Sequence, residues 1–295
     1  MMKKGFVAFV VTFERPSILC DTIEKIFKQS IAPEKLLVVD NSESDFTASM
    51  IHGLNASNIE YYRVGYNAGP AGGVYLGLKL LTDQGYDYIQ WCDDDDPPIF
   101  NDTNEILLAA FDAYENVGVV GQVGAQFNKV TGALIRFDDS SLKMNQYLDV
   151  DFVGGNQLMI IKSEVIKQGC LPEKRLFFGF EDLSFSLKVK AKGYKMLVPC
   201  KLFLKLRVNF SRMGQVKLKR NPSWRDYYSV RSLAYIYLYE QRLVAPLLLL
   251  TIKTIAGLFL RKELKFLPLR GLVHGVSNRL GIIEPPRSKY DIERI

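Results

Sequence analysis

The sequence predicts an α/β fold with a mostly parallel central sheet, flanking helices and a helical C-terminal extension. Over the first 92 residues, short apolar runs alternate strictly with amphipathic runs. Such alternation is typical of a parallel sheet that is covered by helices on both faces. The last 80 residues or so are instead basic and aromatic, and they end in a long apolar run. We therefore expect two domains, residues 1–215 and residues 216–295.

The first four expected strands share a continuous apolar character, and they are residues 5–12, 35–39, 59–64 and 86–92. Pro16 can start the first helix, because its missing N–H is not needed there. Ser42 and Ser44 can cap the second helix, and residues 74–82 form the third. Polar residues follow these strands at Thr12 and Asp40. In open α/β sheets, ligands bind at this carboxyl edge.

Beyond residue 100 the pattern is looser. We expect a helix over residues 105–114, and another that the run 177–185 opens and that continues to about Lys192, with Glu181 and Asp182 in its first turn. The further strands expected there are residues 117–123, 133–137, 151–161 and 195–199.

Four consecutive carboxylates, Asp93 to Asp96, follow the fourth strand and precede Pro97 and Pro98. Like charges this close repel one another, and a folded chain cannot bury them unpaired. Mg²⁺ or Mn²⁺ prefers carboxylate oxygens and would relieve the repulsion. The residues alone leave a second interpretation open, namely a solvated acidic turn closed by the two prolines.

A glycine-rich stretch, residues 65–73, precedes the third helix and lets the backbone approach a ligand closely. The helix N-terminus behind it favours an anion. The stretch contains neither the G-x-x-x-x-G-K-[ST] nor the G-x-G-x-x-G pattern. A tight turn without a ligand is the alternative.

Charge is unevenly divided along the chain. Residues 1–200 hold 19 Lys and Arg against 26 Asp and Glu, whereas residues 201–295 hold 19 against 6. A basic tail favours an anionic membrane or a nucleic acid as its partner. The sequence has no RNA-module motif, so nucleic acid is not expected. Four scattered cysteines and two histidines indicate reduced thiols in the cytoplasm and no ordinary zinc site.

The apolar run 243–260 is near the lower length limit for a membrane span. Arg242, Lys253, Arg261 and Lys265 would share one flank of a single helix. We therefore expect an amphipathic helix that lies on the catalytic domain or on a membrane. In the second case the protein is peripheral on the inner face of the plasma membrane.

Six stretches together resemble a known family, the inverting, GT-A-fold glycosyltransferases of family 2. They are VVTFERP at 10–16, LLVVDNSES at 36–44, YNAGPAGGVYLGL at 66–78, WCDDDDPP at 91–98, FFGFEDLSFSLKVKAKGY at 177–194 and PSWRDYYSVRS at 222–232. The resemblance is strongest to bacterial galactofuranosyl- and rhamnosyltransferases of cell-surface polysaccharide synthesis. It implies a UDP- or dTDP-sugar donor and a saccharide or lipid-linked acceptor.

The resemblance also implies roles for individual residues. Those that would bind the nucleotide sugar are Thr12, Glu14, Arg15, Asp40, Asn67, Gly72, Gly73, Asp93 and Asp94. Asp93 and Asp95 would hold Mn²⁺ or Mg²⁺. The acceptor side would include Trp91, Gly154, Gly155 and Glu181. Asp182 would be the catalytic base. The alternative is that Glu181 and Asp182 only stabilise the start of a helix, because the helix dipole favours acidic residues in the first turn.

Many relatives carry a histidine as a further metal ligand in the region that corresponds to residues 198–207. This sequence has no histidine there. Either fewer protein ligands hold the metal, or Lys205 or Arg207 neutralises part of the diphosphate. Two other functions stay open. One is a metal-dependent nucleotidyl- or phosphotransferase, which would release pyrophosphate or transfer phosphate. The other is a non-catalytic, membrane-associated module.

Overall fold

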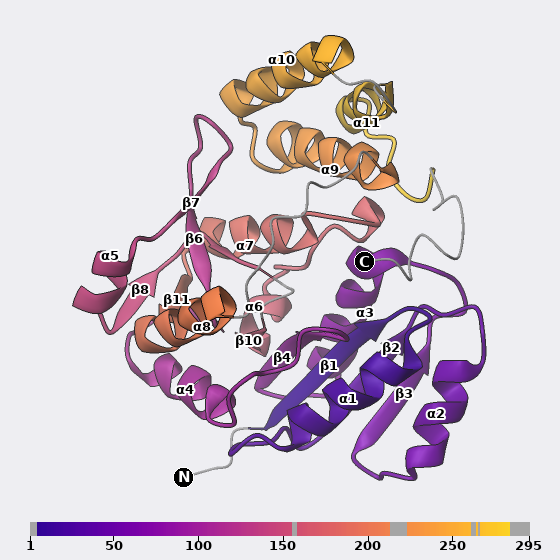
Figure 1. Cartoon of the computed structure of the whole chain (residues 1–295), viewed down its shortest axis with the longest axis vertical. Coiled ribbons are helices and arrows are strands. Elements are labelled where there is room, and N and C mark those ends of the chain that lie inside the picture. Colours follow the sequence, from indigo (N-terminus) through magenta and orange to yellow (C-terminus); the bar gives the residue numbers. More distant parts are fainter. Residues whose placement is uncertain (1–4, 155–157, 213–222, 261–263, 265, 284–295) are drawn as a thin grey trace. The chain divides into compact units, whose positions relative to one another are not determined.

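The computed structural model describes all residues except 1–4, 155–157, 213–222, 261–263, 265 and 284–295 (Figure 1). The chain forms two compact units. The first comprises Met1–Phe127, Leu134–Lys174 and Glu181–Val216. The second comprises Asn128–Ala133, Arg175–Phe180 and Lys217–Ile295. Two short segments from the middle of the chain therefore belong with the tail.

Within the described residues, the first unit has an eight-stranded sheet in the order β3-β2-β1-β4-β10-β5-β11-β8. The strands are β1 (Phe6–Thr12), β2 (Leu36–Asp40), β3 (Ile59–Arg63), β4 (Tyr88–Asp93), β5 (Val117–Gly121), β8 (Tyr147–Asp149), β10 (Met159–Lys162) and β11 (Lys195–Pro199). β10 is antiparallel to β4 and β5, and β8 is antiparallel to β11. The other pairs are parallel, which confirms the expected mostly parallel sheet.

Helices cover both faces of this sheet (Figure 1). On one face lie α1 (Pro16–Phe27), α2 (Phe46–Leu54), α4 (Thr103–Ala109) and α8 (Cys200–Arg212). On the other lie α3 (Gly69–Asp83), α6 (Ser163–Lys167) and α7 (Glu181–Ala191). The smaller elements are η1 (Ala110–Asp112), α5 (Asp139–Met144), η3 (Lys174–Leu176) and an antiparallel sheet of β6 (Gly124–Phe127), β7 (Leu134–Arg136) and β9 (Phe152–Val153).

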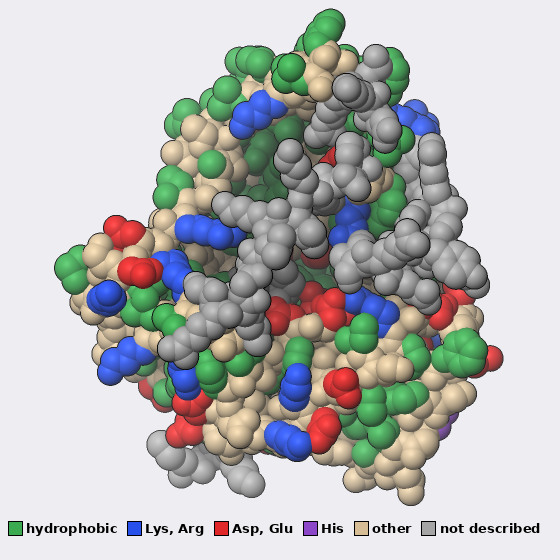
Figure 2. Space-filling view, in the orientation of Figure 1, with side chains coloured by type: hydrophobic (Ala, Val, Ile, Leu, Met, Phe, Trp, Pro, Cys, Tyr) green, Lys and Arg blue, Asp and Glu red, His purple; other side chains and the backbone are tan. Residues whose placement is uncertain are grey.

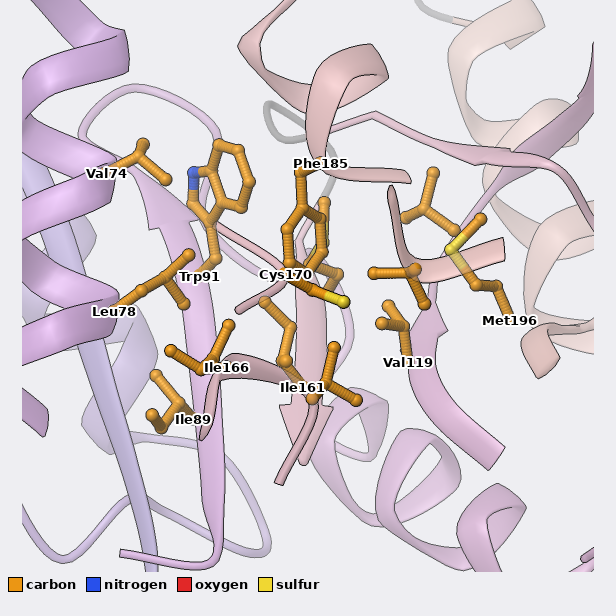
Figure 3. Close-up of a cluster of buried hydrophobic side chains, with 14 of the residues drawn as sticks. Val74, Leu78, Ile89, Trp91, Val119, Ile161, Ile166, Cys170, Phe185 and Met196 are labelled. Carbon is orange, nitrogen blue, oxygen red and sulfur yellow. The ribbon is translucent and has the colours of Figure 1, made fainter. Parts of the chain in front are cut away.

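The buried position of β1 explains its unbroken apolar run. Successive side chains of a strand point to opposite faces of the sheet. Val7, Phe9 and Val11 accordingly join the cluster under α3 and α7, of which Figure 3 shows a part. Phe6, Ala8 and Val10 join the cluster under α1 and α2. Because both faces are covered, a polar residue on either side would be buried.

The second unit contains α9 (Trp224–Tyr235), a π-helical turn (Ile236–Glu240), α10 (Val244–Leu260) and α11 (Phe266–Val276). Glycine lets α11 lie directly against α9, since a Cβ on Gly271 would meet the carbonyl oxygen of Tyr227 at 2.3 Å. The Tyr227 hydroxyl and His274 Nδ1 lie 2.7 Å apart in the same contact. None of the helices in the described part of the chain meets both the length and the hydropathy needed to cross a bilayer.

Three expectations need correction. Only residues 65–68 of the glycine-rich stretch lie outside a helix, because α3 starts at Gly69, five residues before the expected start. The expected strand 151–161 is two strands, β9 and β10, which belong to different sheets. Arg242 precedes α10 and has a positive φ of 53°, so it cannot share a helical flank with Lys253. The other two members of that flank, residues 261 and 265, lie outside the described residues.

Candidate active site

The site is assembled where β1 separates β2 from β4, at the carboxyl edge of the sheet. Strand order reverses at this point, and such a switch point leaves a crevice for a ligand. Thr12 lies level with Asp40 on β2, and Val11 lies level with Asp93 on β4. The Thr12 hydroxyl donates a hydrogen bond of 2.7 Å to Asp94 Oδ2. The register of three strands thus brings the predicted polar residues together.

Asp94 is the most deeply placed member of the acidic run, with 1% of its surface exposed. Its backbone carbonyl accepts a hydrogen bond of 2.7 Å from Thr22 of α1. Arg15 Nη2 lies 2.7 Å from Asp94 Oδ1, and Arg15 also forms an ion pair with Asp95. One guanidinium thus bridges two consecutive carboxylates, in the geometry that arginine is suited to provide.

The acidic run is neither a fully solvated turn nor a set of ordinary carboxylates. Burial, helped by repulsion from Asp94 and Asp95, raises the pKa of Asp93 to about 7. Burial also raises the pKa of Asp94 to about 6, against the lowering effects of Arg15 and Thr12. Asp96 is shifted to a pKa of about 6 by burial and by Asp95. Asp95 is the open member, because 47% of its side chain is exposed.

Three of the residues expected to bind the nucleotide sugar make their contacts within the protein. The resemblance implied that Thr12, Glu14, Arg15 and Asp40 contact its base and ribose. Thr12 and Asp40 are instead buried, and the Asp40 oxygens accept hydrogen bonds of 2.8 Å from the Ser42 N–H and 2.7 Å from the Tyr61 hydroxyl. These two residues therefore support the edge of the sheet rather than line an open surface.

Glu14 holds two loops together. Its carboxylate Oε1 accepts hydrogen bonds of 2.9 Å from the backbone N–H groups of Glu43 and Ser44. Its own N–H donates to Ser42 Oγ at 2.8 Å. Glu14 has a φ of 56°, a value that is uncommon for residues other than glycine. Such a backbone conformation is stable only where the surrounding structure holds it. The loops after β1 and β2 are thus tied to each other.

Asn41, which directly follows β2, anchors the start of α3. Its Nδ2 donates to the Gly69 carbonyl at 3.1 Å, and Asn67 Oδ1 accepts from the Gly69 N–H at 2.9 Å. Gly73 faces the sheet, since a Cβ there would lie 2.4 Å from a methyl group of Val11. A Cβ on Gly72 would meet that of Ala68 at 2.6 Å. The glycines thus serve close packing of α3, and the helix N-terminus they form lies beside β2.

Glu181 and Asp182 form the first turn of α7, and both are half-buried. The Asp182 Oδ1 accepts a hydrogen bond of 2.8 Å from the N–H of Leu183. One turn later, the ring of Phe185 packs edge-on against Trp91 of β4, with 6.1 Å between the centroids (Figure 3). This contact ties α7 to the strand that carries the acidic run. Trp91, which was expected on the acceptor side, is buried in this contact and 2% exposed.

The remaining predicted residues are less informative. Gly154 is buried next to β9, and Gly155 lies outside the described residues. Lys205 lies 3.6 Å from Asp102 and over the ring of Phe100. Arg207 pairs with Asp139 and donates to the Phe137 carbonyl at 2.9 Å. Both basic side chains, which were expected as alternative partners of a diphosphate, thus contact acidic residues of the protein.

A metal would have to be held by few protein ligands. Among the residues that the structure describes, no group of three or more His, Cys, Asp or Glu side chains is arranged to hold a cation. Asp93 and Asp95 remain as a pair of carboxylates on one turn, and the pKa of Asp93 is raised first by burial and then by the charges of Asp94 and Asp95, which a cation would offset. Such a pair fits Mg²⁺ or Mn²⁺, which commonly uses one or two carboxylates together with substrate phosphates.

Comparison with known proteins identifies the family. Residues 7–160, from β1 into β10, match the sequence model of Glycosyl transferase family 2. The chain belongs to glycosyl transferase family 2. The match covers the strands that carry Thr12, Asp40 and the acidic run, and it ends before α7. Family 2 membership therefore rests on the half of the site that the three parallel strands build.

A curated relative is galactofuranosyltransferase GlfT1 of Mycolicibacterium smegmatis, which is 32% identical over 102 residues. These residues make up 35% of this chain and 33% of that protein. The family 2 chain thus spans about a third of the length of this relative.

Solved structures share the fold at low sequence identity. The mannosyltransferase PcManGT from Pyrobaculum calidifontis, in complex with GDP-Man and Mn²⁺, aligns with a TM-score of 0.52 and 15% identity, over 92% of this chain and 87% of that one. Residues 1–349 of S. aureus TarS, in complex with UDP-GlcNAc, align with a TM-score of 0.54 and 16% identity, over 93% and 80%. The chain therefore has the expected GT-A fold.

Proposed function

We propose that this protein is an inverting glycosyltransferase that uses a UDP- or dTDP-sugar donor. The observation that carries the proposal is the contact of Arg15 with Asp94 and Asp95, above the buried bond from Thr12. A single cationic side chain organises two carboxylates at the switch point of the sheet, where a nucleotide would bind. The alternative, a fully solvated acidic turn, would leave all four carboxylates exposed and does not explain the burial of Asp94.

The proposed chemistry assigns Asp182 as general base. An acceptor hydroxyl must lose its proton while it attacks the anomeric carbon, and a carboxylate opposite the leaving group can take it. Attack from that side breaks the bond between sugar and phosphate and inverts the anomeric centre. The contact between Phe185 and Trp91 supports the assignment, because it packs the helix of Asp182 onto the strand of Asp93.

A cation held by Asp93 and Asp95 would supply charge stabilisation for the departing nucleoside diphosphate. The PcManGT structure contains Mn²⁺, and this supports the choice of metal. Arg15 pairs with Asp94 and Asp95, so Asp95 would be shared between the metal and the arginine.

The sugar that we propose is galactofuranose, with rhamnose as the second candidate. The partial identity to a galactofuranosyltransferase favours galactofuranose. The acceptor would be a saccharide or lipid-linked saccharide of a cell-surface polysaccharide. This part of the proposal rests on the resemblance of the six sequence stretches and on this partial identity.

We also propose that the second unit binds the inner face of the plasma membrane through α10. The helix exposes a row of apolar side chains on one face, Val244, Leu248, Ile252, Ile255 and Phe259. Figure 2 shows hydrophobic side chains gathered over this helix. Lys253 is its one charged residue and is exposed, as are Arg242, Arg270 and Arg279 of the same unit. Exposed apolar surface next to basic groups fits an anionic bilayer.

A donor screen tests the proposed activity. Thermal shifts would be measured with UDP-galactofuranose, dTDP-rhamnose, UDP-glucose and nucleoside triphosphates, with and without Mn²⁺. We expect a nucleotide sugar to raise the melting temperature more in Mn²⁺ than in EDTA, and Asp95→Asn to abolish the difference. Stabilisation by triphosphates alone, with release of pyrophosphate, would instead favour a nucleotidyltransferase.

A further inference from the structure

The segment that leads into α7 has an unusual backbone. Phe177, Gly179 and Phe180 have φ angles of 63°, 79° and 67°. The left-handed region is unfavourable for a bulky side chain and persists only where the surroundings fix it. Phe180 is joined directly to Glu181, the first residue of α7. The strain therefore lies immediately before the two acids of the candidate site.

Arg231 of α9 fixes this segment most directly. Its Nη2 donates to the Leu176 carbonyl at 2.7 Å, and its Nη1 donates to the Gly281 carbonyl at 2.6 Å. The side chain is fully buried, and its guanidinium lies 4.6 Å from the ring centre of Tyr228. Among the described residues, no carboxylate pairs with it. A buried cation opposes folding unless its partners compensate, so its place here calls for an explanation.

Other side chains of α9 hold the same segment. The Ser232 hydroxyl donates to the Phe178 carbonyl at 3.3 Å. Phe177 packs on Tyr228 with 5.0 Å between ring centres, and Phe178 packs edge-on against Trp224 at 4.8 Å. Backbone carbonyls and aromatic rings of the segment are thus both engaged by one helix. This explains why residues 175–180 belong to the second unit although they are far from the tail in sequence.

We infer that Arg231 is a positioning residue, which holds residues 175–180 in their strained conformation and so fixes how the chain enters α7 at Glu181 and Asp182. The inference rests on the proposed function, in which Asp182 is the base. It gives α9 a part in catalysis without any contact with substrate. A purely structural Arg231 would stabilise the second unit and leave turnover of the folded enzyme unchanged.

The decisive variant is Arg231→Lys, which keeps the charge but cannot donate to both carbonyls in the geometry of a guanidinium. We expect kcat to fall about tenfold or more, with KM for the donor and affinity for UDP unchanged. Amide exchange of residues 176–183 should become faster. Arg279→Lys is the matched control, because Arg279 is exposed in the same unit, and it should leave kcat unchanged.

A second variant covers the case in which Arg231→Lys does not fold. Phe180→Gly removes the left-handed strain and loosens the segment, so kcat should fall while the melting temperature holds or rises. Asn55→Gly makes the same change at the left-handed cap of α2 and should leave kcat unchanged. Wild-type kcat in Arg231→Lys, or in Phe180→Gly if Arg231→Lys does not fold, would overturn the inference. If the wild-type protein transfers no sugar from any donor, that result counts against the proposed function instead. In that case, unchanged amide exchange in Arg231→Lys would still refute the holding role of Arg231.

Discussion

The carboxylate of Asp93 sits in surroundings that oppose its ionisation. Burial and the neighbouring acids raise its pKa to about 7, whereas an aspartate in an unfolded chain has a pKa of about 4. Between these two values the folded protein binds more protons than the unfolded chain. The free energy of unfolding contributed by this group therefore falls as pH rises through that window.

Replacing Asp93 tests whether its contribution to stability falls as pH rises. In EDTA and without nucleotide, Asp93→Asn should melt several degrees above wild type at pH 8. The difference should shrink toward pH 5, where the wild-type carboxyl is itself protonated. Asp87→Asn, at an exposed position just before the same strand, should shift melting alike at both pH values. A difference for Asp93→Asn that grows toward pH 5 would contradict the assignment.

At the residue scale, the sequence predicted which polar residues would lie at the carboxyl edge of the sheet. It did not predict which of them would be in direct contact. Thr12, Asp40 and Asp94 each follow an apolar run, so their meeting at one edge was foreseeable. The bond from Thr12 to Asp94 depends on β1 lying beside β4, a neighbour relation that sequence order does not reveal. The interior position of Trp91 likewise depends on Phe185, which is distant in sequence.

At the scale of elements, α3 shows why a glycine-rich stretch invites the wrong interpretation. The sequence left two uses of these glycines open, close approach to a ligand or a tight turn, and in the structure those from Gly69 onward allow a helix to lie close to β1. Gly77 continues the pattern, because a Cβ there would lie 2.4 Å from the ring of Phe9. The sequence could not distinguish the two uses, since both require a missing side chain.

Gly77→Ala should therefore destabilise the protein by about 1–3 kcal/mol, because a core ring and two packed elements must shift. Gly53→Ala is the matched control in α2, where nothing lies within 4 Å of the added carbon. That change should be neutral or stabilising by up to about 1 kcal/mol. Urea unfolding of both variants measures the effect, and equal stabilities would contradict the packing role.

The apolar face of α10 makes a second prediction at this scale. Wild-type protein should sediment with vesicles that contain phosphatidylglycerol, less so at high salt, and weakly with phosphatidylcholine alone. Ile252→Glu combined with Phe259→Glu should abolish binding. Met144→Glu, at an exposed position of α5, should not. Retained vesicle binding by the double variant, or a wild-type dimer that the double variant dissociates, would contradict the membrane assignment.

For the molecule as a whole, sequence and structure agree on the GT-A fold. The additional finding is that residues 128–133 and 175–180 cluster with the C-terminal helices. Local patterns do not encode such a connection, because it depends on contacts such as that of Arg231 with Leu176. Catalytic and tail segments of the sequence are therefore interleaved along the chain.

The central claim is sugar transfer with Asp182 as base, and one comparison tests it most directly. Wild type and Asp182→Asn would be incubated with UDP-galactofuranose, Mn²⁺ and a synthetic lipid-linked saccharide. Product mass and UDP release would be followed, and UDP affinity would be measured in parallel. We predict addition of hexose by wild type, a loss of about 10²-fold to 10⁴-fold in the variant, and equal UDP affinity. Transfer by Asp182→Asn at the wild-type rate, or loss of UDP binding together with transfer, would contradict the account.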